Sequence, residues 1–198
     1  YDAFAIDNGL TTFSDNPGRD AQRTLAASLR VEGALSPAVS LVSITGAGRS
    51  DIVFSFDSDW GNDAFWAPFV YDYTSATDRR RDMLNQEFRL FSRPQGRLFG
   101  RADWLVGAYV LHLEERNDKR DLGVDSGFFC PDPCVTRSSS DYEAPSIALF
   151  GRLDVPLTDA LDLTLGLRGE RRDADYTEDF AFETTGFLAE SRTAFEPT

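Results

Sequence analysis

The stretch LDLTLGLRGERR, residues 161–172, decides the fold class that this sequence predicts. Leucine occupies every second position at its start, and polar residues or glycine fill the positions between. The leucines are Leu161, Leu163, Leu165 and Leu167, and the residues between them are Asp162, Thr164 and Gly166, followed by Arg168. A period of two places the leucines on one face of an extended strand. A helical period of 3.6 residues would scatter them around the cylinder. The stretch therefore predicts a strand with one apolar and one polar face.

The residues just before this stretch repeat the same alternation. In IALFGRLDV, residues 147–155, apolar residues or glycine again take every second position. The short segment PLTDA, residues 156–160, carries turn-forming residues between the two stretches. We therefore expect two strands, at about 144–156 and 161–176, that pair as an antiparallel hairpin.

Four earlier strands follow from the same pattern, at about 23–35, 39–56, 83–92 and 98–114. Short turns near Pro37, Gln95 and Asp159 join the strands of each hairpin, whereas the connections between hairpins run for roughly twenty to thirty residues. Short turns at one end and long loops at the other are typical of transmembrane β-barrels. The sequence thus predicts an all-β fold, an antiparallel meander of about six long amphipathic strands that forms a segment of a transmembrane β-barrel and is not closed on its own. The whole chain, 1–198, is then a partial β-barrel domain.

A soluble β-sandwich is the alternative, because its strands also have one apolar face each. Two features favour the barrel. The expected strands exceed the ~5–6 residues usual in globular sheets. Their polar faces also carry full charges in mid-strand, such as Arg30, Glu32 and Arg168, which a water-filled lumen tolerates.

Composition limits the classes of function. The chain has 198 residues, 41% hydrophobic and 13% aromatic, which is enough for a folded domain. Its net charge of -13 disfavours binding to nucleic acid, since affinity for phosphate comes from basic surface. The longest apolar run, residues 104–113, has about half of the ~20 residues that a membrane helix needs, but it matches the ~9–11 of a tilted transmembrane strand. We expect no helical membrane span.

Both cysteines lie in the segment CPDPC, Cys130 to Cys134. The two prolines hold the thiols near each other, which favours a local disulfide in an oxidising compartment. Zinc is the alternative, but a structural site needs four Cys or His ligands and the chain has a single histidine. The disulfide would stiffen the tip of a loop that presents Phe128 and Phe129.

Catalytic and metal sites are not expected. The only histidine, His112, ends the apolar run, where strand packing or the outer rim explains it better than a Ser-His-Asp or Cys-His site. The oxygen-rich group Asp57, Asp59, Asn62 and Asp63 could hold calcium, but its spacing misses the EF-hand loop and lacks the terminal Glu. A solvated loop is favoured there. We therefore expect no enzyme activity, no metal and no cofactor.

Aromatic residues crowd the expected long loop at 58–80, which is unusual for a freely solvated segment. The candidates for contact with a ligand or with the membrane interface are Trp60, Phe65, Trp66, Tyr71 and Tyr73, together with Phe128 and Phe129. In a barrel these rings would lie at the bilayer interface or over the lumen. An interface belt or loop packing is favoured over ligand contact.

Three arginines, Arg79, Arg80 and Arg81, end the same loop. They form either a plain charged rim or a contact with the phosphates of lipopolysaccharide, which a guanidinium group binds in bidentate fashion.

Several blocks of the chain, in order and spacing, resemble TonB-dependent outer-membrane receptors. The strands LNQEFRLFS (84–92), WLVGAYVLHLEE (104–115) and the hairpin at 147–176 resemble successive barrel strands of that family. LVSITGAGRSD, residues 41–51, resembles an earlier SITGY-type strand. The resemblance covers about 23–176.

This resemblance implies energised uptake of a ferric siderophore or similar bulky nutrient, in the bacterial outer membrane and without enzyme activity. The implied partners are outer-membrane lipid and lipopolysaccharide, the small-molecule ligand, and the TonB complex, contacted through a plug domain. A plug, a TonB box and an aromatic-terminated last strand do not appear in this sequence, so we expect an internal slice of a larger receptor. The alternatives are a passive porin-like barrel and a secreted β-sandwich binding module.

Overall fold

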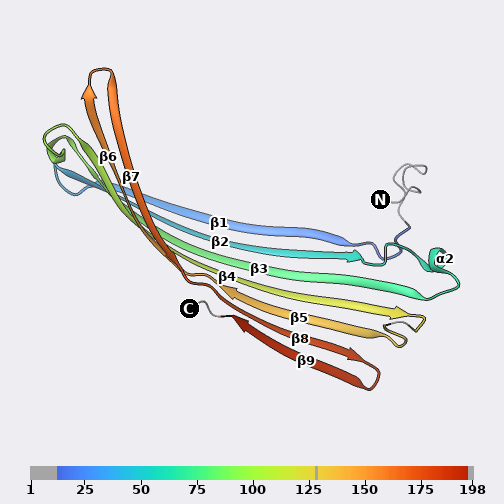
Figure 1. Ribbon diagram of the computed structural model, residues 1–198. Helices are drawn as coiled ribbons and strands as arrows, with labels where there is room; N and C mark the ends of the chain where they lie inside the picture. Colours follow the sequence, from blue (N-terminus) through green and yellow to red (C-terminus); the bar gives the residue numbers. More distant parts are fainter. Residues whose placement is uncertain (1–12, 128, 196–198) are drawn as a thin grey trace.

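A computed structural model describes residues 13–127 and 129–195, which form one curved antiparallel sheet (Figure 1). Its nine strands are β1 (Arg19–Ala34), β2 (Val39–Asp57), β3 (Tyr71–Ser92), β4 (Asp103–Asp125), β5 (Cys134–Glu143), β6 (Ser146–Thr158), β7 (Leu161–Arg172), β8 (Asp175–Thr184) and β9 (Phe187–Phe195). A short helix, α2 (Asp63–Trp66), and a 3-10 turn, η1 (Pro94–Gly96), lie in the connections. Within the described ranges, no helix is long and apolar enough to cross a membrane. The all-β antiparallel fold predicted from the sequence is confirmed.

The strand order reveals that two pairs of elements are halves of longer strands. β4 pairs with β5 along its second half and with β6 along its first half. The break between β5 and β6 falls at Ala144-Pro145, where proline lacks the N–H that a ladder requires. The backbone N–H of Ala144 still donates to the Leu113 carbonyl oxygen at 2.8 Å, and that of Asp173 donates to the Pro145 carbonyl oxygen at 3.1 Å. β7 and β8 are likewise one strand interrupted after Arg172.

The structure contains more strand than the sequence pattern predicted: nine strands, not six. Residues 71–82, expected in a loop, are the first half of β3 and pair with β4, which continues to Asp125 rather than ending near 114. β5 lies inside the expected loop at 115–143, and β8 and β9 occupy most of the region expected to be irregular. The strand expected from 98 begins at Asp103, after an isolated bridge between Leu98 and Ala102. In residues 71–82 and in β5 both faces are largely polar, so backbone pairing forms strands there that hydrophobic alternation does not indicate.

Strand register places the leucines of β7 on one face of the sheet. Leu165 pairs with Leu153, which pairs with Trp104, so these side chains lie in one row. Leu161, Leu163, Leu165 and Leu167 are 40–82% exposed, because nothing in the described residues covers this face. We call it the outward face. The opposite face, with Arg168 and the residues in register with it, we call the inward face.

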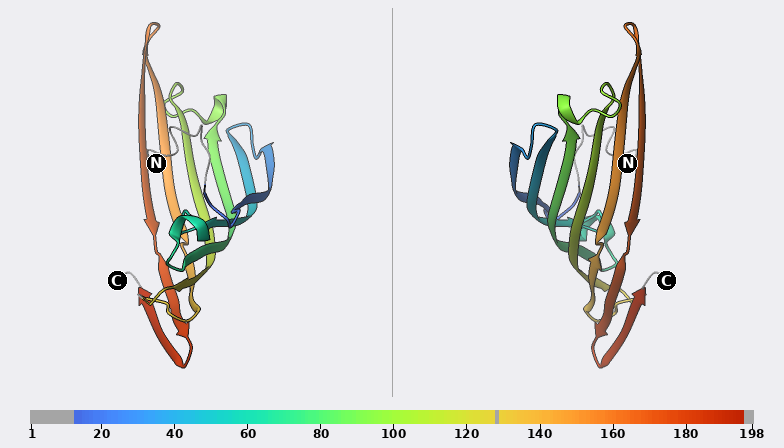
Figure 2. Two further views of the ribbon diagram at one scale, coloured as in Figure 1. Left: turned by 90° about the vertical axis from the view of Figure 1, so that its right-hand side faces the viewer. Right: turned by 90° about the vertical axis from the view of Figure 1, so that its left-hand side faces the viewer.

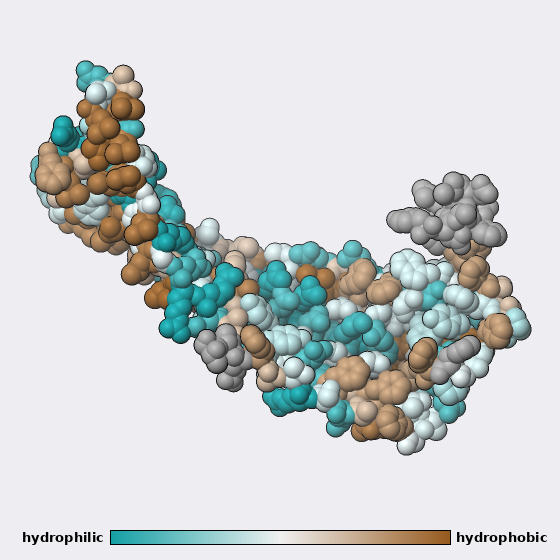
Figure 3. Space-filling model, in the orientation of Figure 1, coloured by the Kyte–Doolittle hydropathy of each residue, from teal (hydrophilic) through white to brown (hydrophobic). Residues whose placement is uncertain are grey.

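The sheet is a single layer, as the two side views show (Figure 2). The most buried apolar residues are few and mostly small, Val42 and Ala148 among them. Apolar side chains instead gather on the surface over the β6–β7 arm, and a hydrophilic zone follows directly along the strands (Figure 3). Such a large exposed apolar patch marks a membrane or protein contact. One layer is not the two-sheet arrangement of the alternative β-sandwich.

Candidate functional site

An arginine on the inward face lies against two aromatic rings. The guanidinium carbon of Arg168 on β7 is 5.6 Å from the ring centroid of Tyr109 on β4 and 5.7 Å from that of Phe150 on β6. These distances fit cation–π contact. The Phe150 ring covers Gly107, where an added Cβ would lie 2.2 Å from the ring, so glycine is required for this close approach. Tyr109 and Phe150 were not among the site residues predicted from the sequence. The available signal was that each lies on the polar face of its strand, β4 or β6.

Ion pairs between residues two apart line the same inward face. They are Arg30–Glu32 at 2.7 Å, Arg89–Glu87 at 2.5 Å, Lys119–Asp121 at 2.9 Å, Arg152–Asp154 at 2.8 Å and Arg168–Glu170 at 2.9 Å. Exposed pairs of this kind contribute little to stability. Their effect is to make the inward face polar and charged in alternating sign, which suits a water-filled passage.

A chain of aromatic rings lies at the long-loop end of the sheet. Successive centroid distances are 5.9 Å for Phe13–Phe65, 5.0 Å for Phe65–Trp66, 4.7 Å for Trp66–Tyr71 and 4.9 Å for Tyr71–Tyr73. Four of the aromatics predicted from the sequence are therefore brought together. Because Tyr71 and Tyr73 are strand residues on the inward face, this chain of rings leads from the loop toward the lumen side of β3.

The remaining predicted aromatics are placed separately. Trp60 is 74% exposed and contacts Phe56, with ring centroids 6.1 Å apart. Phe129 is 84% exposed at the tip of the disulfide loop. Phe128 lies outside the described residues.

Asp59 fixes the loop that carries these aromatics. Its carboxylate accepts hydrogen bonds from the backbone N–H of Gly61 at 2.8 Å, from that of Tyr73 at 2.7 Å, and from the Trp66 indole N–H at 3.1 Å. The side chain of Asn62 caps α2 by accepting from the Phe65 N–H at 2.9 Å. The solvated loop expected here is wrong for Asp57 and Asp59, which are buried.

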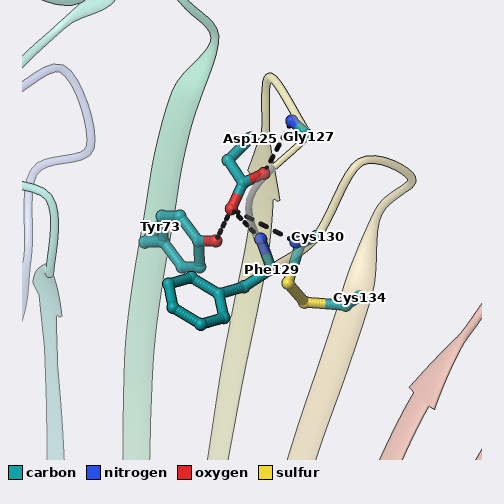
Figure 4. The surroundings of a disulfide bond; sticks show 6 residues. All are labelled: Tyr73, Asp125, Gly127, Phe129, Cys130 and Cys134. Carbon is teal, nitrogen blue, oxygen red and sulfur yellow. Dashed lines mark hydrogen bonds between the residues drawn. A yellow bond between two sulfur atoms is a disulfide. The ribbon is translucent and has the colours of Figure 1, made fainter.

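Asp125 organises the neighbouring disulfide loop (Figure 4). Its carboxylate accepts from the Tyr73 hydroxyl at 2.7 Å and from the backbone N–H groups of Gly127, Phe129 and Cys130 at 2.9, 2.9 and 3.2 Å. Burial, and then this hydrogen bond, raise the pKa of the Tyr73 phenol. Asp125 was not predicted as a site residue from the sequence, in which the Ser-Gly that follows it was the only sign of a turn.

The disulfide loop closes directly onto the start of β5. Cys130 and Cys134 are joined by a disulfide with their Cα atoms 5.6 Å apart, and both are buried. The serine after Asp125 ties this loop to the aromatic loop, because the Ser126 hydroxyl oxygen accepts from the Val70 N–H at 2.5 Å. The two long loops thus form one connected cap at this end of the sheet.

The three predicted arginines do not share a face. Arg80 lies on the outward face with the leucines, next to Asp82 at 3.1 Å. Arg79 and Arg81 lie on the inward face, where both pair with Glu115. Two further arginines join Arg80 on the outward face just beyond the apolar residues. They are Arg49, 2.6 Å from Asp82, and Arg116, 3.0 Å from Asp141.

His112 lies on the outward face at the border between the apolar and charged residues. Its Nε2 atom is 2.7 Å from Glu114, and its Nδ1 atom is 3.7 Å from Glu143. The donor atoms of these three residues lie within 4.8 Å of one another, a set that suits a transition metal. The hydrogen bond between the His112 imidazole and the Glu114 carboxylate accounts for the close approach of this pair without a metal.

Comparisons with known proteins agree with this geometry. The family model "TonB dependent receptor-like, beta-barrel" matches residues 2–195. Among solved structures, the ferric yersiniabactin uptake receptor FyuA from Yersinia pestis is similar, with a TM-score of 0.56 and 15% identity over 90% of this chain. This chain spans 25% of that receptor's chain. No curated protein matches the sequence. At 15% identity, the similarity to this solved structure is evidence for the fold alone.

Proposed function

The chain belongs to the family of TonB-dependent receptor-like β-barrels, and we propose that it forms part of the wall of a receptor that takes up a ferric siderophore or similar bulky nutrient, driven through the TonB complex. Proteins of this family are outer-membrane receptors and transporters of Gram-negative bacteria rather than enzymes. The proposal therefore places this chain in the bacterial outer membrane, as a partial barrel domain completed by other strands and by a plug domain that contacts TonB.

The observation that carries the proposal is the division of one sheet into two unlike faces. The outward face exposes the row of Trp104, Leu153 and Leu165 with its neighbours, and the inward face carries the ion pairs around Arg168. An apolar band outside and a polar interior are what a membrane barrel requires.

The inward face also supports a receptor for a ligand with planar or anionic groups. Arg168, held by the rings of Tyr109 and Phe150, is a fixed cation. The aromatic chain that ends at Tyr73 offers flat apolar surface on the same face, nearer the long loops. FyuA, which is similar in fold, is an uptake receptor for ferric yersiniabactin, and this supports a ferric siderophore as the ligand class.

On the outward face, we propose that Arg49, Arg80 and Arg116 contact the phosphates of lipopolysaccharide. They lie just beyond the apolar band on the side of the long loops, which in barrels of this kind face outward from the cell. Arg79 and Arg81 face inward, where both pair with Glu115, so the proposed contact with lipopolysaccharide does not include them.

Uptake of ferric siderophores under iron limitation tests the proposal. A strain that lacks the complete receptor gene should lose uptake of one siderophore, and re-expression should restore it only in cells with an intact TonB complex. The passive porin-like alternative predicts uptake that is independent of TonB. Restored uptake in cells without TonB would therefore overturn energised transport and favour the porin.

A further inference from the structure

Three side chains that can bind a metal lie around the break in the hydrogen-bond ladder beside β4. The last residue pair between β4 and β6 is Leu111–Ser146, and the first between β4 and β5 is Glu114–Glu143. His112 therefore lies opposite the break, and the two glutamates form the first pair beyond it. The outward face thus gathers one imidazole and two carboxylates where the sheet loses part of its backbone pairing.

The donor atoms of these three side chains converge, and no group outside the trio uses them. One ligand atom from each residue lies within 4.8 Å of the other two. Among the described residues, the only hydrogen bond of His112 and Glu114 side chains is the one between them, at 2.7 Å. Glu143 approaches His112 Nδ1 at 3.7 Å, which is beyond hydrogen-bond distance. Loss of one proton within the trio therefore leaves all three side chains able to bind a metal.

The charges along this part of the sheet also favour a cation. Four carboxylates stand in register across four strands, on Asp82, Glu114, Glu143 and Asp175. Like charges directly opposite one another in a sheet are destabilising. Asp82 has two arginine partners, but in the described part of the chain the other three carboxylates have no arginine or lysine partner. The nearby Arg116 pairs with Asp141 instead. A cation between Glu114 and Glu143 would relieve the repulsion.

We infer that His112, Glu114 and Glu143 hold a divalent transition-metal ion, Zn²⁺, on the outward face. An imidazole nitrogen with carboxylate oxygens suits Zn²⁺, whereas Ca²⁺ and Mg²⁺ prefer oxygen ligands alone. Three protein ligands leave the fourth tetrahedral position to water. The side chains of the three residues are 43%, 59% and 52% exposed, so they can rotate onto the ion while the backbone stays in place.

The ion would join β4 to the end of β5 where Pro145 interrupts the ladder. At this point the Ala144 N–H donates to the Leu113 carbonyl oxygen at 2.8 Å. Bound Zn²⁺ would oppose local opening of this bond, because opening would separate ligands that come from the two strands. The site lies outside the lumen, so the inference goes beyond the proposed uptake function and does not depend on it.

Hydrogen exchange at Ala144 tests the site directly. The complete receptor is purified in detergent and freed of metal with a chelator. Zn²⁺ at about ten times its dissociation constant should then slow exchange of the Ala144 amide roughly tenfold, because it binds only the closed state. Unchanged exchange in saturating Zn²⁺ would overturn the inference. Neither a siderophore nor the TonB complex enters this assay, so its failure is distinguishable from failure of the uptake experiment.

Substitutions locate the ion. His112→Gln and Glu143→Gln should each remove one equivalent of bound Zn²⁺ in calorimetric titration and abolish the Zn²⁺ effect at Ala144. Both positions are exposed, so neither substitution endangers folding. Glu190→Gln, at an exposed position on β9, is the matched control and should change neither readout. An equal response to Zn²⁺ in the Glu143→Gln variant and the unaltered receptor would show that the trio is held by hydrogen bonding and ion pairing alone, and the inference would fail.

Discussion

Arg168 on β7 lies directly opposite Phe150 on β6, with its guanidinium carbon 5.7 Å from the centre of the ring. The same guanidinium is 2.9 Å from Glu170 and 5.6 Å from the Tyr109 centroid. Three contacts from three strands thus hold one cation in place on the inward face. A cation that is already oriented loses little conformational entropy when it meets an anionic ligand, which favours binding.

Replacement of Arg168 by leucine should therefore separate function from stability. Arg168→Leu should change the free energy of unfolding by about 1 kcal/mol or less, because the ion pair is exposed. It should weaken ligand binding by roughly three- to tenfold. Arg171→Leu, on the outward face of the same strand, is the matched control and should leave binding unchanged. Urea unfolding and ligand titration measure the two effects. If the two variants bind the ligand equally well, Arg168 does not contact the ligand.

Replacement of Leu165 by arginine tests the membrane face. Leu165 shares a row with Leu153 and Trp104, so Leu165→Arg should cost about 2–4 kcal/mol of unfolding free energy in a bilayer if the row lies near the midplane. Thr164→Arg, one residue away on the inward face, should cost far less. A spin label at 165 should be accessible to lipid-soluble oxygen and a label at 164 to a water-soluble quencher. The reverse pattern would contradict the assignment of the faces.

Hydrophobic alternation indicated the strands that have one apolar face and missed the strand segments that have none. Leu161 to Leu167 alternate because one face would meet lipid and the other water. Beyond the apolar band both faces of the sheet are polar. Arg80 and Arg81 therefore lie on opposite faces although both side chains are charged. Period-two hydrophobicity therefore disappears at residues 71–82, although the hydrogen-bond ladder of β3 continues through them.

The candidate site was predicted in part for a similar reason. Tyr71 and Tyr73 were candidates because aromatic residues crowd this segment. Their side chains share one face because both lie in the first half of β3, which the hydrophobic pattern did not predict to be a strand. Asp125 is one of 33 acidic residues, and in the sequence only the Ser-Gly that follows it indicates a turn. Its role arises from the pairing of β3 with β4, which brings the Tyr73 hydroxyl to its carboxylate.

Substitutions at Asp125 and Tyr73 should loosen the disulfide loop to different degrees. Tyr73→Phe removes one hydrogen bond to a carboxylate and should cost about 1.5–3 kcal/mol of local opening free energy. Asp125→Asn should cost more, because its amide N–H₂ would face the N–H donors of the loop. Hydrogen exchange of Phe129 and Cys130 measures the opening. Tyr71→Phe, whose ring contacts are retained, is the control, and equal exchange in all variants would contradict the role of Asp125.

The outward arginine should affect lipid binding, and its inward neighbour should not. Arg80→Ala should reduce the lipopolysaccharide that remains bound to the purified receptor, and added salt should reduce it further, because the contact is electrostatic. Arg81→Ala is a matched control, since Arg81 faces inward and pairs with Glu115. Quantification of bound lipid phosphate distinguishes the two variants. A loss with Arg81→Ala as large as with Arg80→Ala would contradict the assignment of faces at this level.

The bond between Cys130 and Cys134 should stiffen the loop tip rather than stabilise the barrel. The ring it closes is short, so chain entropy gives it less than the ~3 kcal/mol of a 15-residue loop. A double Cys→Ser variant should speed hydrogen exchange at Phe129, because the loop tip is no longer closed by the bond. It should keep the global unfolding free energy nearly unchanged, because Asp125 still binds the backbone there. Mass spectrometry of the non-reduced peptide should show the loss of two hydrogens. Two free, alkylatable thiols in protein taken from outer membranes would contradict both the bond and the placement of this loop outside the cell, since thiols that mature in the periplasm become oxidised.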